Sequence, residues 1–419
     1  MSRAVITGVG AACAFGIGVD ALFDGLASGR SCIAPIRSFD ASAFQTQVAC
    51  EIDVGRIDSA WLHSHLGMPD TVLDQYEQAG AWRDRKSAFG LLASFEAWRM
   101  AGCGENERDA ALVVALGLEQ GFLDDFAPFF SDGAIDWDAE RNAASDGIRF
   151  RSDVDLCARI VGEVLQLEGA VVVNASACAA GGLAIAHAAS LIERGAATMV
   201  LCGGADSMVN PFGLGGMTRL GAPSSRNEGD ACRPFDRRRD GLVIGEGAAM
   251  FVLESEERAA RRGARPLARI LGYGSTQDAY RVTAPRPDGA AAQRAMQLAL
   301  TRAKLAPSDI GYINAHGTGT PLNDVAEAGA IRATFGDVPV RSIKGAIGHL
   351  MAASGAIEAA ACLLPFERGL LPGTANHRDK DPLCEANVIG APRAANVDAV
   401  LSNSFGFGGQ NVSLIFGRP

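Results

Sequence analysis

Short apolar segments alternate with alanine-rich segments along the whole chain. A β-branched run at 171–173 and an apolar run at 399–402 predict buried strands, each followed by a turn of small residues or glycines. The segment 183–189 is apolar nearly all round, which predicts a helix buried in the middle of the protein. The stretch 352–366 repeats that character. Strand, small-residue turn and buried helix thus occur once in each half, in an alternation typical of α/β proteins.

The most polar short connection lies at 254–266, and we place the boundary between two halves there. The expected units are 1–262 and 263–419, and a chain of 419 residues is long enough for two such halves. The segment from Glu119 to Asp155 departs from this scheme because it is acidic, with aromatic residues between the acids. A solvated excursion and a specific role both remain open for it.

Composition and charge exclude several classes of protein. The formal net charge of −10 argues against a nucleic-acid partner, which would need a basic surface. Ten cysteines occur without a CxxC pair or a metal-type Cys/His spacing, so we expect a reduced, cytoplasmic protein with no disulfide framework and no metal site. The chain opens on a predicted strand, and no apolar run reaches the roughly 18 residues of a membrane helix. We therefore expect neither a signal peptide nor membrane insertion.

The candidate nucleophile is Cys178, which lies between the predicted strand at 171–173 and the predicted helix that follows. The first turn of a helix has unpaired N–H groups and the positive end of the helix dipole. Both favour the thiolate, which is the nucleophilic form of cysteine. A buried structural cysteine is the alternative interpretation of this segment alone.

Two histidines occupy similar positions in the second half. His316 and His349 each lie in a Gly-rich turn after an apolar strand, and a further Gly-rich turn spans 403–411. In α/β folds, active sites collect at the carboxyl ends of strands. A cysteine and two histidines at strand ends therefore indicate one constructed site.

Six short motifs extend this pattern from the first half to the C-terminus. They are Cys178 with its small neighbours, Arg233-Pro234-Phe235-Asp236, Gly245-Glu246-Gly247-Ala248, His316-Gly317-Thr318-Gly319-Thr320, Lys344-Gly345-Ala346-Ile347-Gly348-His349 and Gly406-Phe407-Gly408-Gly409. In these motifs and their order the chain resembles an elongating β-ketoacyl-[acyl carrier protein] synthase, the ketosynthase of fatty acid and type II polyketide pathways. The resemblance implies a thiolase-like α/β fold, with two similar halves in five layers, α-β-α-β-α.

The resemblance also implies a mechanism, the decarboxylative condensation of an acyl thioester with malonyl-carrier protein. Cys178 would hold the acyl chain as a thioester, and the backbone N–H groups of Cys178 and Phe407 would form the oxyanion hole. His316 and His349 would donate hydrogen bonds to the enolate formed by decarboxylation. Lys344 would orient the second histidine and organise the charge of the site.

Supporting residues follow from the same resemblance. Thr318 and Thr320 match hydroxyls that hold the phosphopantetheine arm, and Phe407 also matches a gate between acyl and malonyl entry. Asp324 and Glu327 follow the His316 turn at family positions, and we interpret Glu327 as a structural or water-holding partner of Lys344. No cofactor is expected, because the substrates are carried on the phosphopantetheine of an acyl carrier protein.

The expected partner is an acidic carrier protein, which must dock on a local basic patch because the chain itself is acidic. Arg85 and Lys86 match the family's basic docking segment. Arg219 follows the turn 213–216, near the expected entrance of the site.

One departure from the family concerns the acyl pocket. A turn that is usually small and apolar is here Leu116-Gly117-Leu118-Glu119-Gln120-Gly121-Phe122. If Glu119 and Gln120 face the pocket, the substrate is short, polar or unsaturated; if they face a partner subunit, they carry no information about the substrate.

Two other interpretations compete with an active ketosynthase. A thiolase needs a second catalytic cysteine near the C-terminus, but the turn 406–409 has none. A chain-length factor, which is a ketosynthase-like subunit without the nucleophile, is disfavoured by Cys178, both histidines and Lys344. The protein as the active half of a heterodimer and the protein as a homodimer both stay open.

Overall fold

The computed structural model describes residues 3–67, 70–104, 107–117, 130–131, 134–135 and 153–419. Most of the acidic segment that begins at Glu119, and the residues Glu119 and Gln120 of the expected pocket turn, lie outside the described residues. In the part of the chain described, no helix is both long and apolar enough to cross a bilayer.

Five strands of the first half form one side of a large mixed sheet. They are β1 (Ala4–Cys13), β5 (Ala111–Leu116), β8 (Val171–Asn174), β9 (Met199–Ser207) and β10 (Glu246–Ser255), in the order β8-β5-β9-β10-β1. β8 and β9 run parallel to β5, whereas β10 is antiparallel to both of its neighbours. Numbered within this half, the strand order is 3-2-4-5-1.

The second half repeats this arrangement. Its strands are β11 (Ala268–Gln277), β12 (Tyr312–Asn314), β13 (Pro339–Arg341), β17 (Ala399–Gly406) and β18 (Gln410–Gly417), in the order β13-β12-β17-β18-β11. That is again 3-2-4-5-1, with the fifth strand antiparallel to its neighbours. A short antiparallel pairing of β1 with β11 joins the two sets. The expectation of two similar halves is confirmed.

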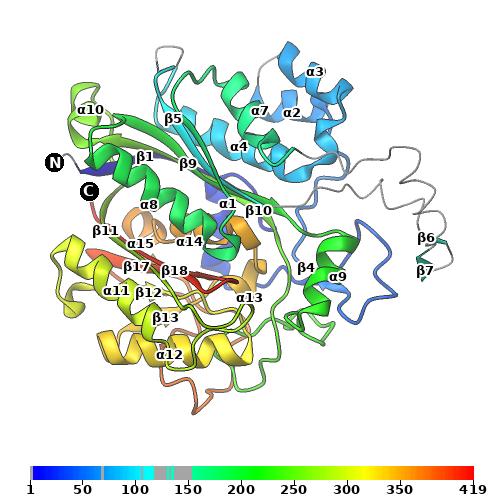
Figure 1. Cartoon of the computed structure of the whole chain (residues 1–419), viewed down its shortest axis with the longest axis vertical. Coiled ribbons are helices and arrows are strands. Elements are labelled where there is room, and N and C mark those ends of the chain that lie inside the picture. Colours follow the sequence, from blue (N-terminus) through cyan, green and yellow to red (C-terminus); the bar gives the residue numbers. More distant parts are fainter. Residues whose placement is uncertain (1–2, 68–69, 105–106, 118–129, 132–133, 136–152) are drawn as a thin grey trace.

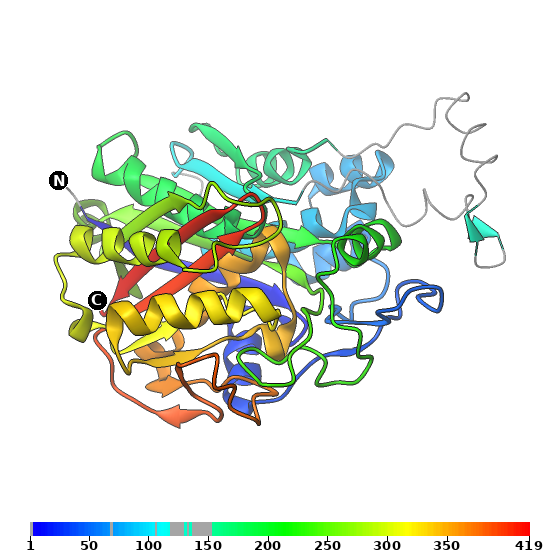
Figure 2. The same cartoon turned by 60° about the horizontal axis from the view of Figure 1, so that its bottom comes forward.

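Helices fill the space between the two sets of strands and cover both outer faces (Figure 1). α8 (Ala180–Glu193) contacts β9 of the first half and β18 of the second, and α14 (Ser354–Ala361) contacts β10 and β17. α4 (Arg85–Met100) and α7 (Leu156–Val164) lie on the outer side of the first half. α11 (Ala290–Ala303) and α12 (Pro321–Phe335) lie on the outer side of the second (Figure 2). The layers are therefore α-β-α-β-α.

The two middle helices touch at their N-termini because glycine occupies the contact. A Cβ atom on Gly181 would lie 2.6 Å from the backbone nitrogen of Ala356, and one on Gly355 would lie 2.5 Å from that of Gly182. Real Cβ atoms do not approach this closely, so only glycine fits. The contact brings the turn before α8, which carries Cys178, close to the turn before α14, which begins two residues after His349.

The structure bears on two of the expected boundaries, that of the second buried helix and that between the two halves. The second buried helix, expected over 352–366, is divided into α14 and α15 (Leu364–Arg368), and Pro365 begins the new helix in its first turn. The connection 254–266 contains the short helix α10 (Glu256–Arg261). The boundary after residue 262 stays a prediction.

Candidate active site

Cys178 lies in a one-turn 3-10 segment, Ala177–Ala179, between β8 and α8. Ala177 has a φ of +47°, which is unfavourable for a residue with a Cβ atom. The second half repeats this feature in the 3-10 segment Met351–Ala353 before α14, where Met351 has a φ of +43°. Strained residues cluster at functional sites, where the surrounding fold holds them in place. Both turns are therefore candidates for a functional role.

The loop after β17 packs closely on the cysteine turn. A Cβ atom on Gly406 would lie 3.1 Å from the backbone nitrogen of Ala179 and 3.2 Å from the carbonyl oxygen of Ser176. The missing side chain leaves room for the next residue, Phe407, whose backbone N–H donates a hydrogen bond to the Cys178 thiol. One donor of the expected oxyanion hole therefore already points at the sulfur.

The resting form of Cys178 differs from the expectation. Burial raises the pKa of its thiol to about 11, while the charge of Lys344 and the N–H of Phe407 act in the opposite direction. Desolvation disfavours the charged thiolate more than the helix N-terminus favours it. The expected lowering of the thiol pKa is therefore wrong for the free site, and the thiol proton must leave as the sulfur attacks.

His349 is held in one tautomer by its neighbours. Its Nδ1 atom accepts hydrogen bonds from the backbone N–H of Met351 (3.0 Å) and from the hydroxyl of Ser354 (2.8 Å). An N–H group can only donate, so Nδ1 carries no proton and Nε2 does. Burial and the charge of Lys344 hold the pKa of His349 well below its usual value. The ring is neutral, with an N–H available to the cavity.

His316 has the same tautomer for a parallel reason. The ammonium group of Lys344 lies 3.2 Å from Nδ1 of His316 and donates to the His316 carbonyl oxygen at 2.6 Å. Burial, then Lys344 and His349, keep the pKa of His316 well below its usual value. The two imidazole rings are 5.4 Å apart and nearly perpendicular. Two neutral Nε2–H donors therefore lie side by side, suited to an oxygen that gains negative charge.

The contacts of Lys344 show that two predictions about this residue are wrong. The lysine contacts the first histidine, His316, not the second, and its ion-pair partner is Glu358 on α14. Glu327 instead accepts the backbone N–H groups of His316 and Gly317, both at 2.8 Å, so it shapes the turn. Burial raises the pKa of Glu358 to about 7, with Lys344 acting to lower it.

Sequence reasoning missed Glu358, although the chain contains a signal for it. Glu358 is the one charged residue of the stretch Ser354–Ala361, which is otherwise small and apolar. A carboxylate in a fully buried helix needs a charged partner, and the cation of the motif set that lies closest to Glu358 in the sequence is Lys344.

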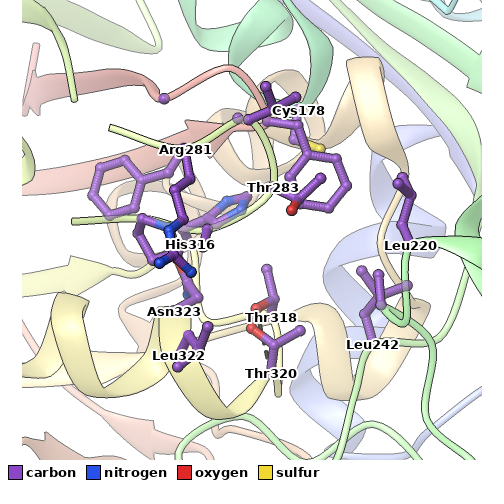
Figure 3. Close-up of a pocket in the computed structure, with 18 of the residues that line it drawn as sticks. Cys178, Leu220, Leu242, Arg281, Thr283, His316, Thr318, Thr320, Leu322 and Asn323 are labelled. Carbon is purple, nitrogen blue, oxygen red and sulfur yellow. Dashed lines mark hydrogen bonds between the residues drawn. The ribbon is translucent and has the colours of Figure 1, made fainter. Parts of the chain in front are cut away.

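Most of the predicted site residues line one cavity of about 490 Å³, whereas Lys344 and Glu327 are not part of its lining. Its lining includes Cys178, both histidines, Phe407 and the two predicted threonines, Thr318 and Thr320. Figure 3 shows Thr318 and Thr320 below Cys178 and His316, with Leu220 and Leu242 along one side. The threonine hydroxyls are 2.8 Å apart, at a position where they can hold a polar arm.

The expected docking residues do not lie together on the surface. Lys86 is 2% exposed and pairs with Asp84 at 3.0 Å. Arg85 pairs with Glu246 at 2.7 Å, and its side chain is 20% exposed. A docking surface needs exposed charges, so this placement contradicts that role for both residues. Arg219 is exposed at the end of α9 (Pro211–Arg219), next to the cavity residue Leu220.

A cysteine on a strained turn, two neutral histidines and a buried lysine, placed where two similar halves meet, define a condensing enzyme of the thiolase fold. Residues 1–259 match the family described as Beta-ketoacyl synthase, N-terminal domain, and residues 267–378 match Beta-ketoacyl synthase, C-terminal domain. The chain belongs to the β-ketoacyl synthase family.

Relatives and solved structures agree with this assignment. The chain is 34% identical to the tetracenomycin polyketide synthase ketoacyl synthase alpha subunit of Streptomyces glaucescens, over 100% of this chain and 97% of the relative. It is 35% identical to 3-oxoacyl-[acyl-carrier-protein] synthase 2 of Coxiella burnetii, over 99% and 98%. A β-ketoacyl synthase structure from Burkholderia phymatum is 34% identical and superposes with a TM-score of 0.86, over 100% of each chain. The ishigamide ketosynthase/chain length factor structure is 32% identical, with a TM-score of 0.83, over 100% and 99%.

Proposed function

We propose that this protein extends an acyl chain by condensing it with the malonyl unit of an acyl carrier protein, using Cys178, His316, His349 and Lys344. The observation that carries the proposal is the pair of neutral Nε2–H donors beside Cys178 in one cavity that opens to the surface. The first step is transfer of the acyl group. The thiol of Cys178 attacks the incoming thioester, and its proton ends on the departing pantetheine sulfur. The carbonyl oxygen accepts from the N–H groups of Cys178 and Phe407.

The second step forms the nucleophilic carbon. The bond between the malonyl carboxylate and its α-carbon breaks, CO2 leaves, and the electron pair moves onto the thioester oxygen as an enolate. That oxygen accepts hydrogen bonds from Nε2 of His316 and of His349. The enolate carbon then attacks the thioester on Cys178, a carbon–carbon bond forms, and the sulfur leaves as a thiolate that takes one proton from water, so that each turnover consumes one solvent proton. Lys344 stays charged and holds Nδ1 of His316 as an acceptor.

The test separates acyl transfer from decarboxylation. His349→Ala and His316→Ala should lower malonyl-dependent CO2 release about 100-fold or more while Cys178 still becomes acylated, since one oxyanion donor is worth about 10²–10³ in rate. His187→Ala is the matched control, because His187 is exposed on the same helix that follows Cys178. A His349→Ala protein that releases CO2 at the wild-type rate contradicts the enolate role.

We further propose that the carrier protein docks at the rim of the cavity. Leu220, Val282 and Leu322 line the cavity and are 50%, 73% and 63% exposed. Arg219 and Arg281 are exposed beside them. Exposed apolar side chains with flanking cations suit a partner that presents an acidic helix and an arm-linked thioester. In this proposal the rim takes the place of the half-buried Arg85 and the buried Lys86 as the docking surface.

Charge reversal tests this surface. Arg219→Glu and Arg281→Glu should weaken turnover of carrier-bound substrate and leave turnover of a small thioester unchanged. The control is Arg194→Glu at the far end of α8, about 20 Å from Cys178 for a helix of this length. Equal effects of all three changes, or equal loss on both substrates, contradict docking at the rim.

We also propose that the chain works as a dimer formed through β8. This strand lies at one end of the sheet order, and its Val171 is 53% exposed. An exposed apolar edge strand is a template for pairing with another chain. A dimer mass for the purified chain in solution supports two copies of this chain, whereas a monomer that becomes a dimer only when a ketosynthase-like subunit is added supports the heterodimer. The ten cysteines are free, which supports a cytoplasmic location.

A further inference from the structure

Arg341 is the largest of the fully buried side chains described. It ends β13 in the second half, 0% exposed. Its Nη2 atom donates to the hydroxyl of Tyr312 at 3.3 Å, and no described carboxylate forms an ion pair with it. The Nε and Nη1 atoms have no protein partner among the described residues. A buried cation without partners is costly, so these donors need an explanation.

Two buried oxygen atoms in the same layer also lack a protein partner. They are Oδ1 of Asn314 and Oε2 of Glu358. Asn314 and Arg341 are register partners on the parallel strands β12 and β13, so their side chains leave the sheet on the same face. α14, which carries Glu358, packs on the neighbouring strand β17. Two donors and two acceptors thus remain in one polar layer between sheet and helix.

Contacts across this layer place Arg341 close to Glu358. The Tyr312 hydroxyl that accepts from Arg341 is itself 3.7 Å from the sulfur of Cys362, and Cys362 lies one helical turn after Glu358. Burial raises the pKa values of Glu358, Cys362 and Tyr312, and the positive charge of Arg341 acts against this rise in all three groups. Water, which both donates and accepts, is the molecule that satisfies donors and acceptors together.

The layer connects directly to the catalytic site. The other carboxylate oxygen of Glu358 pairs with Lys344, and Lys344 donates to Nδ1 and to the carbonyl oxygen of His316. If Glu358 took up a proton, Lys344 would lose its ion-pair partner. The charged form of the lysine would then be less stable beside the neutral imidazole of His316. The charge state of Glu358 therefore controls a catalytic hydrogen bond.

We propose that Arg341 is a positioning residue whose guanidinium, joined through ordered water to Glu358, keeps that carboxylate ionised and thereby holds Lys344 on His316. The inference rests on the proposed function, since it concerns the histidine that receives the enolate. The groups that face Glu358 are Lys344 from α13 (Lys344–Ile347), Arg341 from β13 and the Ser404 hydroxyl from β17. The thiols of Cys178 and Cys362 also lie within electrostatic reach.

The experiment is a pH profile of malonyl-dependent CO2 release by the full-length protein. In Arg341→Met the acidic limb of the profile should move upward by about one pH unit, because one neighbouring charge shifts a buried carboxyl by about that much or more. Arg341→Lys keeps the charge and should restore the wild-type limb. Acylation of Cys178, which does not use His316, should change little in either variant.

The outcomes separate the alternatives. A wild type without CO2 release would contradict the proposed function itself. An active Arg341→Met protein with an unmoved acidic limb would overturn the role of Arg341 and leave the proposed function standing. If the variant does not fold, a high-resolution crystal structure of the wild type decides. Water bonded to both Arg341 and Glu358 supports the inference, and a guanidinium turned to another carboxylate overturns it.

Discussion

Replacing Glu358 by Gln removes the carboxylate that pairs with Lys344 in the middle of the protein. Both side chains are 1% exposed, so solvent does not screen the pair. The lysine would keep only neutral acceptors, which are the amide oxygen of the substituted side chain and two atoms of His316 at 3.2 Å and 2.6 Å. Breaking a buried ion pair by removing one partner costs about 3–5 kcal/mol, because the remaining charge is uncompensated. For a chain of 419 residues this corresponds to a fall in Tm of roughly 3–6 °C.

The assay is a double-mutant cycle measured by thermal and urea unfolding. Lys344→Met should destabilise the protein by a similar amount, since it leaves the carboxylate unpaired. In the double variant, which has neither charge, the loss in free energy of unfolding should be less than half of that in either single variant. The reason is that two apolar or neutral side chains can replace a buried ion pair at little cost. If the losses of the single variants simply add in the double variant, the two groups are not coupled and the reasoning about the catalytic charge network fails.

Three further predictions follow from the same geometry. Alkylation of Cys178 by iodoacetamide should speed up about tenfold per pH unit from pH 7 to 9 without a plateau, because burial raises the thiol pKa to about 11; a plateau near pH 8 would contradict a buried neutral thiol. Ser354→Ala removes one of two hydrogen bonds to Nδ1 of His349 and should slow CO2 release about five- to tenfold with acylation unchanged, since such a bond is worth about 1 kcal/mol. Gly355→Ala should destabilise the protein by about 1–3 kcal/mol through overpacking against Gly182. Gly329→Ala in α12 is the control and should be neutral or stabilising, because the added Cβ atom meets no neighbouring atom. Similar unfolding midpoints for these two variants would refute the close contact.

Local pattern was enough to predict the reactive groups. Cys178, His316 and His349 each follow a short apolar strand, and glycine or small residues surround them. Such turns are set by neighbours in the sequence, so their position could be predicted without long-range information. The repeat of strand, turn and buried helix also lies within short windows of the chain. The two similar halves follow from it, and the strand orders confirm them.

Only the tertiary structure decided how charges are paired and which of them are exposed. Lys86 carries a charge typical of a surface, but α4 packs so that it is buried against Asp84. The partner of Lys344 is 14 positions away on the middle helix, and Arg341 and Asn314 meet through a pairing of strands. Electrostatic energy depends on distance and burial, which the order of residues does not specify. Burial likewise reversed the expected shift of the Cys178 pKa, because desolvation outweighed the local helix N-terminus.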